Sequence, residues 1–143
     1  MAFCSNGIEF LSNGESYFFS PKHRGIGNPN ASVWLKNISF QIEHQIADIA
    51  INNNMYVEQQ KQPVAYNLYK ANNKICAIGY NVKRKDLIIA KFVNSSPNTW
   101  HGYPGDYIGK MQDKPNQTTL KQLVLNGVIS KKEMSRISRG QPL

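Results

Sequence analysis

Three segments with strand character follow one another in the middle of the chain, and they constrain the fold more than any other feature. They are residues 64–69, 75–82 and 87–93. The last is rich in β-branched side chains, which favour extended structure. Short polar turns at residues 71–74 and 83–86 separate the three segments. Because short turns join consecutive antiparallel strands, the sequence predicts a meander with residues 75–82 as a central strand.

Two apolar clusters near the N-terminus predict a further pair of strands. Residues 8–11 and 17–19 flank Asn13-Gly14, a dipeptide that is typical of tight hairpin turns. Together with the central segments, this hairpin predicts an antiparallel sheet of about five strands, which is within the usual size of a sheet.

One longer helix is predicted between the hairpin and the central strands. It would start at Ser32, a candidate N-cap, and run to about Asn52, with isoleucines at helical spacing on one face. The segment from Trp34 to Ile42 also alternates with a period of two, so a strand followed by a shorter helix is the alternative. His44 lies between polar neighbours on the flank of this helix, and we expect it to be an ordinary surface histidine.

The C-terminal region predicts two short helices joined by a tight turn. Gly127 is suited to end the first helix, and Ser130 with Glu133 matches a capping box at the start of the second. The predicted fold class is therefore α+β, with an antiparallel sheet, one longer helix and a C-terminal helical hairpin. The chain length favours a single domain over residues 1–143, divided into an α+β core (1–109) and a basic helical hairpin tail (110–143).

Positive charge is concentrated toward the C-terminal end of the chain. The formal net charge is +8, from 17 basic and nine acidic residues. The segment from Lys110 onward holds seven basic and two acidic residues, a net charge of +5. Such a basic region is typical of proteins that bind nucleic acid or another polyanion, although a basic surface also keeps a protein soluble or binds an acidic protein partner.

The leading functional prediction is a nucleic-acid-associated binding protein. Two aromatic residues, Trp100 and Tyr103, would stack on an unpaired base. The phosphate contacts would come from basic residues of the predicted helical tail, namely Lys121, Lys131, Lys132, Arg136 and Arg139. A loop with Lys22, His23 and Arg24 before two glycines is a candidate anion-binding site that would extend these contacts.

The segment of residues 97–107 is the second candidate site. Pro97 and Pro104 predict an irregular loop, because proline interrupts a strand. His101 is the best candidate for acid–base catalysis, and Asp106 is near enough in sequence to orient it. A small hydrolase or nuclease that uses these two residues, with Lys22 or Arg24 against the phosphate, is therefore an alternative function.

A third alternative is a protein-binding inhibitor module anchored by the aromatic segment from Trp100 to Tyr107. The sequence contains no apolar run long enough to span a membrane and no signal-peptide pattern, so we expect no membrane association and a cytoplasmic location. Cys4 and Cys76 are expected to be reduced thiols. No ligand spacing predicts a metal site, and no motif predicts a cofactor.

Overall fold

The computed structural model describes residues 7–25, 29–57 and 62–143. It has the predicted α+β class, with three α-helices, a six-stranded sheet and two smaller sheets among these residues. In chain order the elements are β1 (Ile8–Phe10), β2 (Ser16–Phe18), η1 (Pro21–His23), β3 (Val33–Trp34), α1 (Phe40–Asn53), β4 (Met55–Val57), β5 (Pro63–Asn67), β6 (Lys70–Ala71), β7 (Lys74–Ile75), β8 (Gly79–Tyr80), β9 (Asp86–Leu87), β10 (Ala90–Ser96), β11 (Thr99–Pro104), η2 (Met111–Asp113), α2 (Gln117–Leu125) and α3 (Lys131–Ser138).

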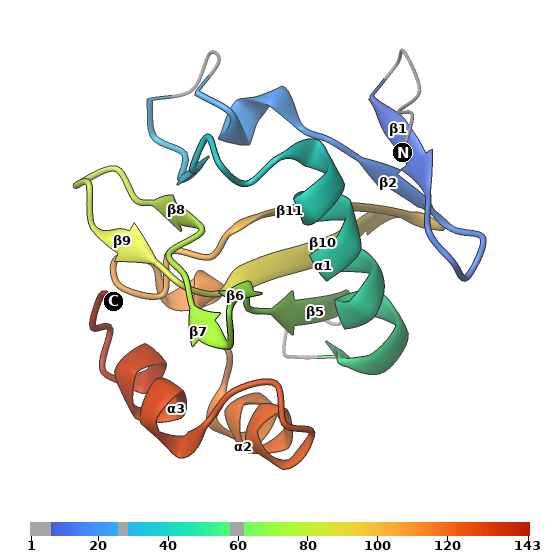
Figure 1. The fold of residues 1–143 in the computed structure, drawn as a ribbon. Coiled ribbons are helices and arrows are strands. Elements are labelled where there is room, and N and C mark those ends of the chain that lie inside the picture. The colour runs from blue at the N-terminus through green and yellow to red at the C-terminus, as the bar shows by residue number, and fades with distance from the viewer. Residues whose placement is uncertain (1–6, 26–28, 58–61) are drawn as a thin grey trace.

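The main sheet has the strand order β1-β2-β11-β10-β5-β4 (Figure 1). The predicted N-terminal hairpin is confirmed, because β1 and β2 pair antiparallel with Ile8 opposite Phe18. Its turn contains Gly14 at a φ of 89°, in the left-handed region that favours glycine. Strand β2 then pairs with β11 in parallel, with Phe18 opposite His101, so the sheet is mixed and not wholly antiparallel.

The predicted meander is wrong. Strand β10 pairs directly with β5, with Phe92 opposite Ala65, and residues 75–82 are not a strand of the main sheet. Ile75 is the last residue of β7, which pairs with β6, and Gly79 and Tyr80 form β8, which pairs with β3 and β9 in a separate small sheet. Ile78 in this segment is fully buried, so its apolar character reflects a segment packed across the core.

The predicted irregular loop at residues 97–107 is also wrong, because it contains strand β11. The prolines limit this strand and do not prevent it: Pro97 precedes it, and Pro104 is its last residue. Its side chains alternate, with Trp100 and Gly102 buried on one face and His101 and Tyr103 on the other.

Helix α1 begins at Phe40 and not near Ser32. The Ser39 hydroxyl accepts a hydrogen bond from the Ile42 amide and so caps the helix. The residues before it form β3, so the alternative of a strand before a shorter helix is closer to the structure. Ser32 is buried, and its hydroxyl donates to the carbonyl oxygen of Pro104 at 2.7 Å.

Two buried clusters make the fold three-layered, with α1 on one side of the main sheet and α2 and α3 on the other (Figure 1). The cluster under α1 contains Trp100 and Phe92 from the sheet. The cluster under α2 and α3 contains Leu120, Leu123 and Ile137 from the helices. His101 and Tyr103 therefore lie on the sheet face that α2 and α3 also cover in part.

The predicted C-terminal helical hairpin is confirmed. Asn116 caps α2, Gly127 follows that helix at a φ of 75°, and Ser130 begins α3. The predicted capping box is present, because the Ser130 amide donates to Glu133 Oε1 at 2.8 Å and the Glu133 amide donates to Ser130 Oγ at 3.2 Å.

In the described part of the chain, no helix has both the length and the apolar character that crossing a membrane requires. Cys76 is a half-buried free thiol. Cys4 lies outside the described residues.

Candidate functional site

A cavity of about 420 Å³ beside β11 brings together residues that are far apart in the sequence. From η1 come Lys22 and His23, and from β11 come His101 and Tyr103. The segment at η2 adds Lys110 and Asp113. Two of the three candidate anion-binding residues therefore line the same cavity as the candidate acid–base histidine.

The Tyr103 ring contacts the imidazole rings of both histidines. The His23 and Tyr103 rings stack with centroids 4.7 Å apart and planes 15° from parallel. The His101 ring is tilted 27° from the Tyr103 ring, with centroids 6.2 Å apart. Strand β11 fixes His101 and Tyr103 on one face, and the stacking holds His23 against them.

Each imidazole is held through its Nδ1 atom. His23 Nδ1 lies 2.9 Å from the carbonyl oxygen of Ser32. Because a carbonyl oxygen only accepts, this nitrogen carries the hydrogen and His23 Nε2 keeps a free lone pair. His101 Nδ1 lies 3.1 Å from Ser95 Oγ. Among the described residues neither Nε2 atom has a hydrogen-bond partner, and neither atom is fully buried.

Both histidines are neutral at pH 7. Burial lowers the pKa of His23 to about 4, and the charge of Lys22 adds to this effect. Burial and Lys22 also lower the pKa of His101. Neutral imidazoles are proton acceptors, which is the state that a general base or an anion site coupled to protonation requires. His23 accepts at Nε2, whereas His101 accepts at whichever ring nitrogen carries no hydrogen, because the Ser95 hydroxyl can donate or accept.

The cavity carries a net positive charge. Asp113 is its acidic residue, and its carboxylate accepts hydrogen bonds from the Tyr103 hydroxyl at 3.0 Å and the Asp106 amide at 3.1 Å. The ammonium group of Lys91 lies 3.8 Å from the same carboxylate and balances its charge. The remaining charged side chains of the cavity are Lys22 and Lys110, so its formal net charge is +2.

Asp106 does not orient His101. It is 3% exposed, and its Oδ1 atom accepts hydrogen bonds from Asn81 Nδ2 at 3.1 Å and from the Gly109 amide at 2.9 Å. The carboxylate therefore stabilises the turn after β11. The His101–Asp106 pair that the hydrolase hypothesis used is not formed.

Arg24 points away from the cavity into the core. Its guanidinium donates to Glu43 Oε1 at 2.5 Å and to the carbonyl oxygen of Ile38, and it lies 4.7 Å from the Phe40 ring centroid. The Tyr17 hydroxyl donates to the other oxygen of Glu43 at 2.5 Å. Burial raises the pKa of Glu43, and Tyr17 and Arg24 act against this shift. Arg24 is therefore a structural cation, since its charge is used inside the fold.

His44 is buried, and the prediction of a surface histidine is wrong. It is 5% exposed, and its Nε2 atom lies 2.7 Å from the carbonyl oxygen of Phe10. Its polar sequence neighbours suggested a solvent-facing flank, but α1 is covered at this point by the N-terminal hairpin.

The aromatic residues of the 97–107 segment are largely internal. Trp100 is fully buried, and its indole N–H donates to Glu15 Oε1 at 3.4 Å. Tyr107 is 1% exposed. Trp100 therefore has no free ring face on which a base could stack, and the segment offers no exposed aromatic anchor for a protein partner.

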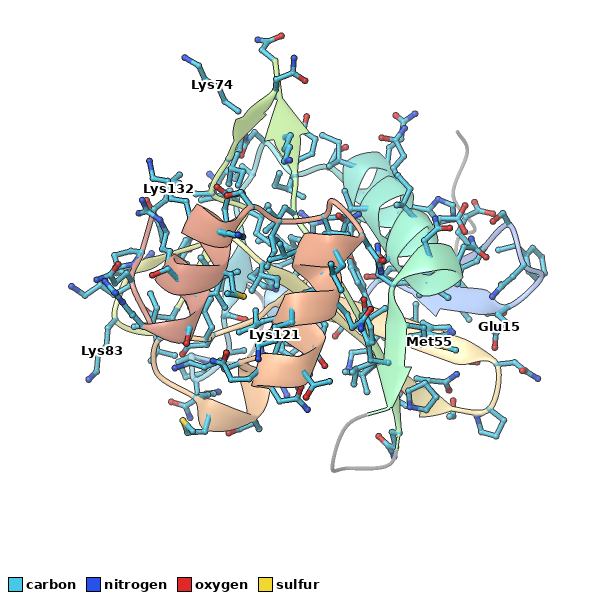
Figure 2. All side chains as sticks on the ribbon, turned by 90° about the horizontal axis from the view of Figure 1, so that it is seen from below. Glu15, Met55, Lys74, Lys83, Lys121 and Lys132 are labelled. Carbon is cyan, nitrogen blue, oxygen red and sulfur yellow. The ribbon has the colours of Figure 1, made fainter. Side chains whose placement is uncertain are left out.

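The second candidate site is a groove between the β6–β7 hairpin and α3, which we call the basic groove. Four basic residues line it, Lys70 and Lys74 from the hairpin and Lys132 and Arg136 from the helix. Figure 2 shows Lys132 on the side of α3 that faces the hairpin carrying Lys74. Its volume is about 290 Å³, and its acidic side chain is Glu133.

Glu133 remains ionised in this groove. Burial acts to raise the pKa of this carboxyl, but hydrogen bonds from Ser130 and the charges of Lys70 and Lys132 lower it overall. Lys70 from the hairpin and Glu133 from the helix line the same groove, so their charges are close enough to interact.

The other basic residues of the predicted interface lie on the helices but outside this groove. Lys121 on α2 and Lys131 on α3 are exposed, and so is Arg139 at the end of α3 (Figure 2 labels Lys121). Arg136 lines the groove, and its guanidinium donates to the carbonyl oxygen of Pro142 at 2.6 Å. Lys70 and Lys74 were not identified from the sequence, because their turn is distant in sequence from α3 and no local pattern predicts that the two meet.

Comparison of the chain with protein-family models, curated proteins and solved structures finds no match. Within the described residues, no group of three or more His, Cys, Asp or Glu side chains is arranged to hold a metal ion. Function is therefore inferred from the geometry and charge of the two sites.

Proposed function

We propose that the protein binds nucleic acid, and that its C-terminal helices contact the phosphates from the basic groove outward. One observation carries the proposal: Lys70 and Lys74, from a hairpin distant in sequence, line one groove with Lys132 and Arg136 of α3. Clustering four cations in a groove with a single acidic side chain, Glu133, raises the local positive potential, and clustered positive charge is the electrostatic footprint of a nucleic-acid site.

The chemistry of this groove favours phosphate contact over reading of bases. Lysine ammonium groups and an arginine guanidinium bind phosphate oxygens without reporting sequence. The apolar side of α3 is occupied, because Ile137 is fully buried against the core, so the outer basic side of the helix is the one free to bind. Lys121, Lys131 and Arg139 would extend the contact along the two helices.

The test is binding of fluorescently labelled single-stranded and duplex DNA and RNA, followed by anisotropy over a series of salt concentrations. Each phosphate contact contributes about 0.9 to the slope of log K against log salt on duplex DNA. We expect Lys74→Gln and Lys132→Gln each to reduce that slope by about one. The matched control is Lys83→Gln, an exposed lysine in a different turn that lies away from the groove (Figure 2).

Equal losses in Lys83→Gln and Lys132→Gln would mean that net charge alone causes binding, and an affinity independent of salt would refute phosphate contact. An acidic protein partner would use the same cations. It would be recognised by competition from a polyglutamate chain that is as strong as competition from DNA of equal charge.

A second candidate function, hydrolysis of a phosphate ester at His101, is supported by a separate observation. His101 shares a cavity with Lys22 and His23, which is the meeting of two distant segments that the hydrolase hypothesis required. The test is turnover of labelled RNA and of simple phosphate esters by the protein and by His101→Gln, with the fold of the variant checked by circular dichroism. Equal turnover by both proteins would remove His101 from the reaction.

A further inference from the structure

The cavity beside β11 combines fixed positive charge with two proton acceptors, and the basic groove uses neither. We propose that this cavity binds a phosphate monoester, and that His23 and His101 take up protons when the phosphate enters. The proposal does not depend on nucleic-acid binding by the basic groove, because the two sites share no residue.

The donors that a phosphate needs line the cavity. Lys22 is exposed and has no hydrogen-bond or ion-pair partner among the described residues. Lys110 donates one hydrogen bond, to the carbonyl oxygen of Asn30 at 3.3 Å, and an ammonium group has two further hydrogens. The Nε2 atoms of His23 and His101 are both donors once the two imidazoles are protonated. A phosphate group has enough oxygens to accept from all four side chains.

The charge of the cavity explains why phosphate entry and protonation are coupled. Burial and the charge of Lys22 lower the pKa values of both histidines, although Asp113 acts against this at His23, so protonation is unfavourable while no phosphate is bound. A phosphate monoester brings a charge of about −1.5 to −2 at neutral pH, which reverses that repulsion. A nearby opposite charge favours the cationic imidazole, so each histidine binds its proton more tightly in the complex.

The groups that face the two imidazoles come from every neighbouring element. They are Lys22 from η1, Tyr103 from β11, Lys110 and Asp113 at η2, and Lys91 from β10 behind Asp113. The Tyr103 phenol stays neutral, because burial and then Asp113 raise its pKa. Asp113 and Lys91 balance each other. The two histidines are therefore the groups in this cavity whose protonation a bound phosphate would favour.

Charge also selects the kind of phosphate. An internal phosphodiester of a nucleic acid carries one negative charge, whereas a monoester carries nearly two. A cavity with two lysines and two protonatable histidines is better matched by the monoester. Such a group occurs both at the phosphorylated end of a nucleic-acid chain and in a small phosphate ester, and the experiment separates these sources.

The experiment is an NMR titration of the imidazole signals of His23 and His101 against pH, without phosphate and with saturating inorganic phosphate. We expect both pKa values to rise by about one unit or more, which corresponds to roughly tenfold tighter proton binding in the complex. Linkage is reciprocal, so phosphate affinity rises by the same factor for each proton taken up.

Variants test whether the named residues of the cavity cause the phosphate-induced rise in the histidine pKa values. Lys22→Gln removes an exposed cation and leaves the core intact, and we expect it to weaken phosphate binding at least fivefold and to reduce the pKa rise of both histidines. Lys36→Gln is the matched control, an exposed lysine that does not line the cavity. His101→Gln should abolish the pH dependence carried by His101 and leave that of His23. Histidine pKa values that do not change with phosphate would overturn the proposal, and so would equal phosphate affinity of Lys22→Gln and Lys36→Gln.

The source of the phosphate is assigned with two oligonucleotides that differ only in a 5′-phosphate. Histidine shifts caused by the phosphorylated form alone assign the end of a nucleic-acid chain. Shifts caused by inorganic phosphate and by neither oligonucleotide assign a small ester. Because the signals belong to His23 and His101, these outcomes are read independently of whether the basic groove binds the rest of the chain.

Discussion

Replacing His23 with asparagine is expected to make the protein less sensitive to acid. In the folded protein the imidazole stays neutral, since burial lowers its pKa to about 4 from an ordinary value of 6.5. The unfolded chain binds a proton at this residue below about pH 6.5, and the folded chain does so only near pH 4. The stabilisation is therefore complete above pH 6.5 and is lost as the pH falls from there toward 4.

The size of the effect follows from the two pKa values. At about pH 5 this residue lowers the free energy of unfolding by about 2 kcal/mol relative to neutral pH. His23 is 7% exposed, so solvent screens little of this penalty. In the variant the asparagine side-chain amide occupies the position of the imidazole Nδ1 and continues to donate to the Ser32 carbonyl oxygen, but it does not titrate.

The assay is urea unfolding of both proteins at about pH 7 and at about pH 5. The asparagine side chain does not stack on the Tyr103 ring, so the variant will be less stable than the unsubstituted protein at pH 7. The informative quantity is the change in unfolding free energy between the two pH values, which we expect to be about 2 kcal/mol smaller in His23→Asn. Equal changes in the two proteins, or an NMR pKa of His23 near 6.5, would refute the reasoning.

Three further substitutions test the packing that holds the sites. Glu43→Gln removes the buried carboxylate that balances the partly buried Arg24 and should cost about 3 kcal/mol in urea unfolding, and a loss below about 1 kcal/mol would contradict an ion pair shielded from solvent. Gly102→Ala would place a Cβ atom 2.2 Å from Cδ1 of Phe92, and we expect a loss of about 2 kcal/mol or more in thermal unfolding, whereas unchanged stability would mean that the strand packs less closely. Ser130→Ala removes the capping bond of α3 and should cost about 1 kcal/mol with reduced helical circular dichroism; an unaltered melting curve would contradict it.

The features that could be predicted from the sequence depend on a few neighbouring residues. The turn at Asn13-Gly14 and the capping box of Ser130 and Glu133 are local arrangements, and both are present in the structure. The meander could not be excluded on local grounds. Residues 75–82 are apolar because the segment passes through the core, where Ile78 is buried. Periodicity alone does not distinguish such a segment from a strand of the main sheet.

Residues of the candidate site could be predicted one by one, but the sequence did not predict that they lie together. His101 was identified from its chemistry, and His23 from its place between two cations. Their meeting follows from the parallel pairing of β2 with β11, which puts Phe18 opposite His101 and so brings η1, a few residues later, beside the strand. The same long-range packing turns Arg24 inward to Glu43, which no local pattern indicated.

The pairing of β2 with β11 also has a consequence for how the chain is made. The hairpin of β1 and β2 is synthesised before α1 and the strands from β3 to β10. The strand that pairs with the free edge of β2 is β11, which is synthesised after all of them. A nascent chain that ends before Thr99 therefore exposes the open edge of β2, a template for pairing with another chain. Because contacts between distant segments form slowly, the N-terminal hairpin must wait for the second half of the protein to leave the ribosome.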